Sequence, residues 1–289
     1  MSYDLWFRSE TPLTVDAMCE YFSVRPNFEV STARAHYENE ATGVYFGFDF
    51  GGVTDGPEEG HAPVAFNINY FRPHVFGLEA EPVLTAFVDA FQLRVEDPQM
   101  EGMADGGYSP EGFLRGWNAG NVFGYRACLP DTSPLTLPSA QIESIWRWNF
   151  ANPLTVEHMM DLIDTAPPCF VPRVMFFQTG ERAVSSLVVW DTRMAIAIPE
   201  VDLVLTMTDA GPLVAPASEV LPMLDVHSAW QPDYEVAPRR PVGLSTRLVD
   251  EVSPEHSRKI QSLMRPFQPV ARLSVDQILD AELVAAARR

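Results

Sequence analysis

Two segments of the chain repeat the same helical spacing of apolar residues. Apolar side chains recur at i, i+3, i+4 and i+7 across residues 15–22 and again across residues 84–91. This spacing places them on one face of a helix, which can then pack on a sheet or on a second helix. Thr14 can cap the first helix, and Pro82 suits the first turn of the second. We therefore predict two one-sided helices within residues 1–100.

Five apolar runs lie around these helices and predict strands. They are Tyr3–Arg8, Phe28–His36, Val44–Phe50, Val64–Phe71 and Leu93–Glu96. The resulting order, β-α-β-β-β-α-β, places two helices against one mostly antiparallel sheet. The predicted fold class is α+β, with an N-terminal ferredoxin-like antiparallel sheet that carries one extra strand and two helices.

A glycine stripe marks the next predicted helix. Ser109-Pro110-Glu111 supplies an N-cap, a proline in the first turn and an early acid. Glycine then recurs every four residues from Gly112 to Gly124, and each one costs about 0.8–1 kcal/mol relative to alanine inside a helix. Close packing against another element is the preferred explanation. A ligand-approach surface holding Trp117, Asn118 and Asn121, or a break in the helix, remains an alternative.

The middle of the chain predicts a second domain of helices followed by strands. Helices are expected at Ser139–Phe150 and from Pro153 to Ile163. Short turns separate four β-rich runs and predict an antiparallel β-meander. The four runs are Phe170–Gln178, Val184–Trp190, Met194–Ile198 and Val201–Met207.

Three parts follow from these elements. Residues 1–106 form an acidic α+β domain, and residues 107–237 form the domain of helices and β-meander. Residues 238–289 form a C-terminal helical extension that we expect to pack on the second domain. Its helices are predicted to begin at Ser253-Pro254-Glu255 and at the capping-box pattern Ser274-x-x-Gln277.

Charge is distributed unevenly over these parts. Residues 1–106 carry 18 carboxylates against five arginines, a net charge of −13, and residues 107–237 carry −9. Residues 238–289 carry +3. An acidic surface repels nucleic acid and anionic lipid and raises the association rate with a cationic protein. We therefore expect a basic protein partner, no nucleic acid and no membrane.

The acidic residues on or beside loops of the first domain are the candidate partner-binding residues. A solvated surface that aids solubility is the alternative explanation for them. We expect the first domain to engage the partner with the loop from Asp55 to His61. The candidate residues are Glu38, Glu40, Asp55, Glu58 and Glu59.

Catalytic signatures are absent from the sequence. It holds no phosphate-binding glycine loop, dinucleotide fingerprint, zinc-protease helix or nucleophile elbow. We predict no catalytic residue, no cofactor and no metal, and leave open whether the chain is an enzyme, with a preference for no. The alternative function is an enzyme or small-ligand-binding protein with a site at the junction of the domains, formed by Trp117, Asn118, Asn121 and His158. A scaffold subunit is a third possibility.

His74 is the histidine that we considered as a general base, because Arg72 and Pro73 precede it directly. A surface position or a hydrogen-bonded role is the preferred interpretation. The three cysteines lie far apart, and neither a secretory signal nor a long apolar stretch is present. We therefore expect a cytoplasmic protein.

The opening Ser2-Tyr3-Asp4-Leu5-Trp6-Phe7, followed by the strand, helix and hairpin just derived, resembles the start of bacterial immunity proteins. Such proteins are encoded beside polymorphic or secreted toxins. The resemblance covers residues 1–100 and implies stoichiometric binding of a toxin domain in the cytoplasm; toxins that attack nucleic acid are often basic. The function predicted from the sequence is therefore that of an acidic protein-binding protein, with toxin neutralisation as its specific form.

Overall fold

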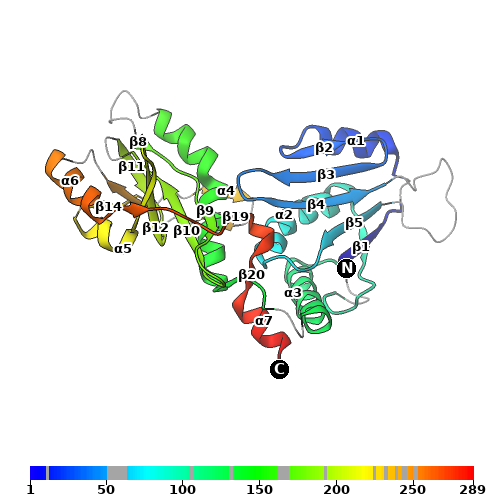
Figure 1. The fold of residues 1–289 in the computed structure, drawn as a ribbon. Helices are drawn as coiled ribbons and strands as arrows, with labels where there is room; N and C mark the ends of the chain where they lie inside the picture. The colour runs from blue at the N-terminus through cyan, green and yellow to red at the C-terminus, as the bar shows by residue number, and fades with distance from the viewer. Residues whose placement is uncertain are drawn as a thin grey trace. The chain divides into compact units, whose positions relative to one another are not determined.

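A computed structural model gives the fold of the chain (Figure 1). It describes residues 1–10, 13–50, 64–103, 107–129, 133–161, 169–191, 194–223, 226–230, 234–237, 240–242, 246–249 and 253–289. For residues 158–161, 169, 226–230, 234–237, 240–242 and 246–249 only the backbone is described.

The chain forms two compact units. Unit 1 comprises residues 1–134 and 275–289, and unit 2 comprises residues 135–274. The expected boundary after residue 106 is therefore too early, because the glycine-rich helix belongs to the first unit. The expected docking of the C-terminal extension on the second domain is also wrong for residues 275–289, which return to unit 1.

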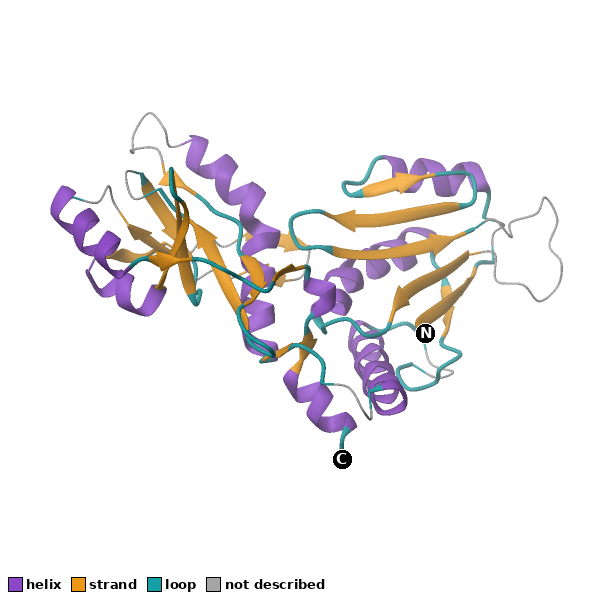
Figure 2. Cartoon of the chain, viewed as in Figure 1, coloured by secondary structure: helices purple, strands orange, loops and turns teal. Residues whose placement is uncertain are grey.

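Unit 1 is built on one six-stranded sheet in the order β2-β3-β4-β5-β1-β6, with antiparallel neighbours (Figure 2). Because β1 lies between β5 and β6, a helix must carry the chain over β1. The mixed α+β class is confirmed, while the ferredoxin-like assignment stays a prediction. The strands are β1 (Ser2–Arg8), β2 (Phe28–Val30), β3 (Arg34–Asn39), β4 (Val44–Asp49), β5 (Val64–Asn69) and β6 (Arg94–Glu96); the helices are α1 (Val15–Ser23), α2 (Val75–Phe91), α3 (Pro110–Cys128) and α7 (Ala281–Ala287).

Two expectations for this unit need correction. The predicted strand Phe28–His36 is a hairpin of β2 and β3, in which the Ser31 backbone N–H donates to the Arg34 carbonyl oxygen at 2.8 Å. Pro82 lies inside α2 rather than in its first turn. The apolar side chains that α2 buries offset the hydrogen bond that an interior proline removes.

Phenylalanines form the core between the sheet and its helices. Phe22 of α1 lies 4.8 Å from Phe48 of β4, centroid to centroid, and Phe87 of α2 lies 5.0 Å from the same ring. Phe113 of α3 meets Phe66 of β5 edge-on at 5.8 Å. The face of the sheet that carries these rings is therefore buried under the three helices.

The glycine stripe of α3 lies where aromatic side chains approach the helix closely. A Cβ on Gly116 would come within 3.0 Å of the Tyr3 hydroxyl oxygen, and one on Gly120 would meet the Tyr70 ring as closely. Ser109 caps the helix, its hydroxyl accepting from the Gly112 N–H at 3.0 Å. The preferred explanation, close packing of one continuous helix, is therefore what the structure shows.

Unit 2 holds two main sheets, in the orders β18-β13-β12-β10-β9-β19 and β14-β17-β11-β8. Its strands are β7 (Thr136–Leu137), β8 (Cys169–Phe170), β9 (Met175–Gln178), β10 (Val184–Val189), β11 (Ala195–Ile198), β12 (Leu203–Thr208), β13 (Gly211–Pro216), β14 (Val226–Trp230), β15 (Tyr234–Ala237), β16 (Arg240–Val242), β17 (Thr246–Val249), β18 (Arg265–Pro266) and β19 (Ala271–Leu273). Its helices are α4 (Ser139–Asp161), α5 (Ala217–Val220), the 3-10 turn η1 (Leu221–Met223) and α6 (Pro254–Leu263).

The expected antiparallel meander is wrong. β10 pairs with β9 in antiparallel fashion but with β12 in parallel, while β11 joins the other sheet beside β8 and β17. Turn residues between two runs show that the chain changes direction. They do not say whether the next strand stays in the same sheet.

The two helices expected in residues 139–163 are one helix, α4, with Pro153 in its interior. Buried polar side chains of α4 bind the backbone of the segment that leads into β9. Asn149 exchanges two hydrogen bonds with the main chain of Val174, and the Trp148 indole N–H donates to the Pro172 carbonyl oxygen at 2.7 Å. These contacts anchor the part of α4 that precedes Pro153.

The C-terminal segment also differs from expectation. Residues Val275–Gln277 form a 3-10 turn (η2) and Leu279–Asp280 a short strand (β20), so the last helix begins at Ala281 rather than after Ser274. Val284 and Ala287 of α7 pack with Tyr125 of α3. The Arg126 guanidinium donates to the Ala287 carbonyl oxygen at 3.4 Å.

Candidate functional site

The side of the first sheet turned away from its three helices is polar, and we call it the outer face. Along β1, Tyr3, Leu5 and Phe7 are buried, while Asp4 and Trp6 between them point to the other side. The same alternation holds along the neighbouring strands. The outer face comprises Ser2, Asp4, Trp6, Arg8, Glu29, Arg34, His36, Glu38, Tyr45, Gly47, Asp49, Ala65, Asn67, Asn69, Arg94 and Glu96.

Strand register sets these side chains in rows across the sheet. One row contains Trp6, Ala65 and Asp49, because Trp6 pairs with Ala65 and Ala65 with Asp49. The next row contains Asp4, Asn67 and Gly47. The small residues therefore lie on the central strands β4 and β5, with larger side chains beside them.

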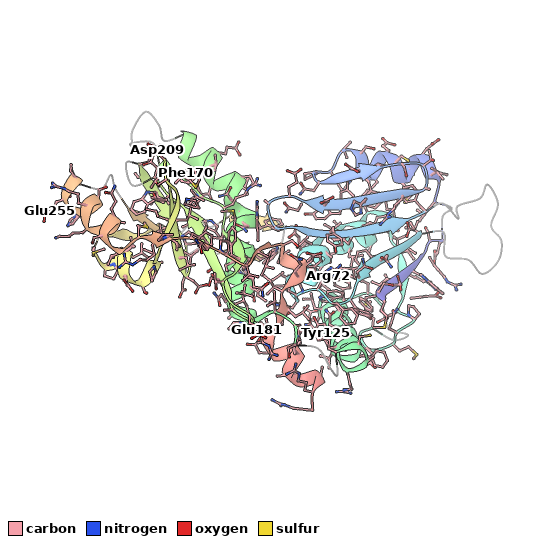
Figure 3. The ribbon with its side chains drawn as sticks, in the orientation of Figure 1. Arg72, Tyr125, Phe170, Glu181, Asp209 and Glu255 are labelled. Atoms are coloured by element: carbon pink, nitrogen blue, oxygen red, sulfur yellow. The ribbon has the colours of Figure 1, made fainter. Side chains whose placement is uncertain are left out.

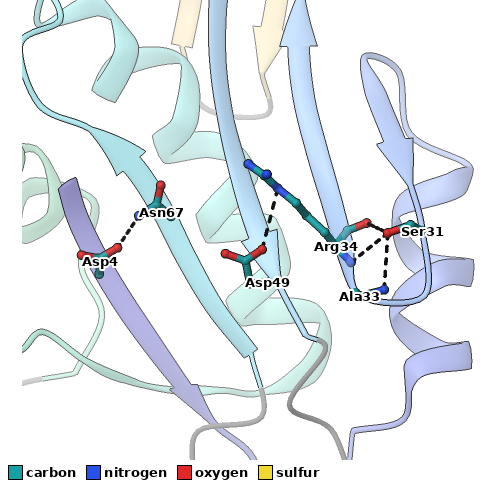
Figure 4. Close-up of polar contacts among 6 residues, drawn as sticks. All are labelled: Asp4, Ser31, Ala33, Arg34, Asp49 and Asn67. Atoms are coloured by element: carbon teal, nitrogen blue, oxygen red, sulfur yellow. Dashed lines mark hydrogen bonds and ion pairs between the residues drawn. The ribbon is translucent and has the colours of Figure 1, made fainter. Parts of the chain in front are cut away.

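Polar contacts hold the long side chains of the outer face against the sheet (Figure 4). The Asn67 amide donates to the Asp4 carboxylate. The Arg34 guanidinium lies 3.7 Å from the Asp49 carboxylate and 3.0 Å from the point where a Cβ on Gly47 would be. Arg34 thus lies flat over the glycine, which limits how far it projects into solvent.

Much of the outer face is exposed, although Arg72 and Asp276 contact Tyr45 at one end, and the face carries excess negative charge. The side chains of Glu38 and Asp49 are 63% and 59% exposed, and Trp6 is 45% exposed. Five carboxylates stand against three arginines in the set defined above. Ion pairs between exposed groups contribute about 0–1 kcal/mol each, so the arginines do not commit these carboxylates to internal partners.

Two of the five predicted partner-binding residues lie in the described part of the chain. Glu38 and Glu40 are exposed at the turn that joins β3 to β4. Asp55, Glu58 and Glu59 lie outside the described residues; the segment that carries them, 51–63, joins the far end of β4 to β5.

Sequence reasoning missed most of the outer face. Asp4 and Trp6 lie within a strand, whereas the binding residues predicted from the sequence are acids on or beside loops. Apolar and polar residues alternate strictly over residues 2–8. This alternation could have identified the outer face, because the polar positions of a strand share one face of its sheet.

Two residues of the predicted alternative ligand site have structural contacts in unit 1. Trp117 is fully buried and stacks on Tyr70 with centroids 5.7 Å apart. The side-chain oxygen of Asn121 accepts from the Phe71 main-chain N–H at 2.9 Å, and its side-chain amide donates to the Arg72 carbonyl oxygen at 3.3 Å. Asn121 thereby supports Phe71, whose φ of +63° is uncommon for a bulky residue.

Asn118 and His158 are the other two residues of the predicted ligand site. Asn118 is half-buried, and its side-chain oxygen has no hydrogen-bond partner among the described residues. The side chain of His158 lies outside the described part of the chain. The structure therefore brings Trp117 and Asn121 together, and the site as a whole stays a prediction.

A second polar cluster joins distant parts of unit 1. The main-chain N–H of His74 and its Nδ1 lie 2.7 and 2.5 Å from the carboxylate of Asp280. Arg72 donates to the Tyr45 hydroxyl oxygen at 2.8 Å, and that hydroxyl donates to Asp276 at 3.1 Å. Burial raises the pKa of Tyr45 despite the nearby guanidinium. Of the two roles preferred for His74, the hydrogen-bonded one is what these contacts show; they attach the C-terminal segment.

Arg72 is also held through its backbone, because the Tyr125 hydroxyl of α3 donates to its carbonyl oxygen at 3.0 Å (Figure 3). The side chain of Arg72 thus contacts Tyr45 of β4, while its main chain contacts Tyr125 of α3. The cluster is a structural junction and not an open site.

Part of the negative charge of unit 1 is internal. The unit carries 23 carboxylates against nine arginines. Four of these acids, Glu79, Glu81, Asp97 and Asp280, are buried, and each accepts hydrogen bonds there. Only the exposed acids of unit 1, and not its whole excess of negative charge, can therefore contact a partner at the surface.

No helix among the described residues combines the length and apolarity needed to cross a membrane. Within the same residues, no three histidine, cysteine or acidic side chains are grouped so that they could hold a metal ion.

Comparison with known proteins adds no relative. No protein-family model matches the chain, and neither the curated proteins nor the solved structures include a significant match.

Proposed function

We propose that this chain is an acidic protein-binding protein whose outer face docks a positively charged protein. The observation that carries the proposal is the acid-rich face of the first sheet, on which Glu38, Asp49 and Trp6 are exposed. The resemblance of residues 1–100 to immunity proteins makes a toxin domain the specific partner that we propose, bound stoichiometrically in the cytoplasm. A ferredoxin-like sheet would suit this role, because one side carries helices and the other is available.

The form of the outer face favours a macromolecule over a small substrate. Small-molecule sites are concave and mostly apolar, with a few convergent polar groups. Here charged and amide side chains alternate over several neighbouring strands, and an exposed tryptophan lies among them. Aromatic residues and arginine are enriched in protein interfaces, and a polar rim is usual.

The negative charge of unit 1 supports a positively charged partner. Unit 1 carries −14 of the total net charge of −19. Opposite charge on a partner would raise the association rate, and salt would reduce that advantage. The role of the buried acids is separate, because they have hydrogen-bond donors inside the unit.

The test begins with capture of a partner from native lysate on the full-length chain, followed by its purification. Association rates are then measured for the wild type, for Glu38→Lys/Glu40→Lys and for Glu58→Lys/Glu59→Lys. We expect each double reversal to slow association by about three- to tenfold at low salt and to flatten its salt dependence.

The matched control is Glu181→Lys/Asp209→Lys, which changes net charge equally on exposed residues of unit 2 (Figure 3). We expect a smaller effect from this variant. Equal slowing by the control and the Glu38/Glu40 variant would reduce the effect to net charge and contradict the docking role of the outer face.

A further inference from the structure

Trp6 is an exposed indole in the middle of a strand. It is 45% exposed on β1, the strand between β5 and β6. Its cross-strand partner on one side is Ala65, whose methyl group is too short to cover an indole ring. On the other side it pairs with Glu96.

Carboxylates lie on two sides of this indole, and Arg8 follows it by two residues on the same face. Asp4 precedes it by two residues on the same face, and its carboxylate accepts from the Ser2 hydroxyl and the Asn67 amide. Both donors are neutral, so they leave the charge of Asp4 in place. Glu96 is paired with Arg8 at 2.8 Å, in a pair whose side chains are 42–51% exposed.

We infer that Trp6 is the anchoring contact of the outer face and that it receives an arginine side chain of the protein partner. This inference rests on the proposed function and names the chemistry of its central contact. The guanidinium would stack on the indole with the Asp4 carboxylate beside it.

The geometry favours arginine over other cationic or apolar groups. A planar guanidinium stacks on an aromatic face, is more weakly hydrated than an ammonium and can bind a carboxylate with two N–H groups. A cation over tryptophan contributes about 0.5–1 kcal/mol at exposed sites and about 2 kcal/mol once water is excluded. An apolar partner side chain would gain nothing from the surrounding carboxylates.

The experiment uses the full-length chain and a hexapeptide of alternating glycine and arginine as the probe. The readout is the Trp6 indole N–H signal in a nitrogen-proton correlation spectrum, identified by its loss in Trp6→Phe. Matched peptides replace arginine by lysine, by leucine or by citrulline, the uncharged analogue of arginine. We expect the arginine peptide to shift the Trp6 signal most, lysine less, and leucine and citrulline not at all.

Variants then test the contact against its surroundings. Trp6→Ala should raise the dissociation constant of the arginine peptide by about three- to thirtyfold, with a smaller change for Trp6→Phe. Asp4→Asn should raise it as well. Phe123→Ala is the control, because Phe123 is an aromatic residue of α3 that is even more exposed than Trp6, and it should change nothing.

The outcomes separate this inference from the proposed function. Shifts at Glu38 and Glu40 without any at Trp6 would overturn the anchor and leave an acidic docking face intact. Equal shifts of Trp6 by the arginine and citrulline peptides would overturn the cationic character of the contact. Absence of any binding to the outer face would contradict both.

Discussion

Nδ1 of His74 lies 2.5 Å from a carboxylate oxygen of Asp280, a residue 206 positions later in the chain that is fully buried. A second oxygen of the same carboxylate accepts from the His74 main-chain N–H at 2.7 Å. This pair ties the C-terminal segment to the start of α2. Unit 1 is therefore completed by the last 15 residues of the chain.

Removing the carboxylate of Asp280 should destabilise unit 1. Asp280→Ala leaves two donors of His74 without their acceptor, and we expect the free energy of unfolding to fall by about 2–4 kcal/mol. Asp276→Ala is the control, because its side chain is 25% exposed and should cost about 1 kcal/mol or less. Urea unfolding followed by circular dichroism measures both, and equal losses would argue against the anchoring role.

Two glycines of α3 should respond oppositely to the same substitution. Gly120→Ala places a methyl group against the Tyr70 ring, which is stacked on Trp117 and has no room to move. We expect a loss of about 1–3 kcal/mol despite the better helix propensity of alanine. At Gly124 the nearest atom is the end of the Met1 side chain, 3.3 Å away.

Gly124→Ala should therefore be neutral or stabilising by up to about 1 kcal/mol. Thermal unfolding of the two variants in parallel checks the contrast. If Gly120→Ala were the more stable of the two, the packing explanation of the stripe would fail.

Unit 1 should lose stability in alkali through its buried tyrosines. Tyr37 is buried and donates to Glu79 at 2.8 Å; burial, followed by the nearby carboxylate, raises its pKa above the ordinary value of 10.0. The folded state holds this proton more tightly, so its contribution is complete below about pH 10 and is lost as the pH rises above it.

Tyr37→Phe tests this linkage. At neutral pH it should lower the free energy of unfolding by about 1–2 kcal/mol, because Glu79 loses a donor. Above pH 10 the remaining decline should be shallower than in the wild type by up to about 1.4 kcal/mol per pH unit. Urea titrations at several pH values give both quantities, and parallel pH profiles would show that Tyr37 does not contribute.

Local pattern predicted most elements of unit 1, and packing decided the rest. Alternation and helical spacing identified β1 and α1, and the N-cap at Ser109 identified α3. The same rules predict that each of Pro82 and Pro153 lies at the start of a helix, whereas both lie inside one. Tertiary contacts stabilise these helices although each proline removes a backbone hydrogen bond. The exchange of β11 into another sheet depends on contacts that no local window contains.

The candidate face was only partly predictable for a related reason. Negative charge pointed to unit 1 and to exposed Glu38 and Glu40, both of which are local properties. The grouping of Asp4, Trp6 and Asp49 requires the register of three strands, which the sequence does not state. His74 and Asp280 likewise meet only through the return of the chain end.

The most direct test of a docking outer face is carboxylate labelling of the full-length chain with a carbodiimide and an amine, read by mass spectrometry with and without the captured cationic partner. The account predicts that the partner reduces labelling of Glu38 and Asp49 and leaves Glu181 and Asp209 unchanged. Unchanged labelling of Glu38 and Asp49 alongside protection of Glu181 or Asp209 would contradict it.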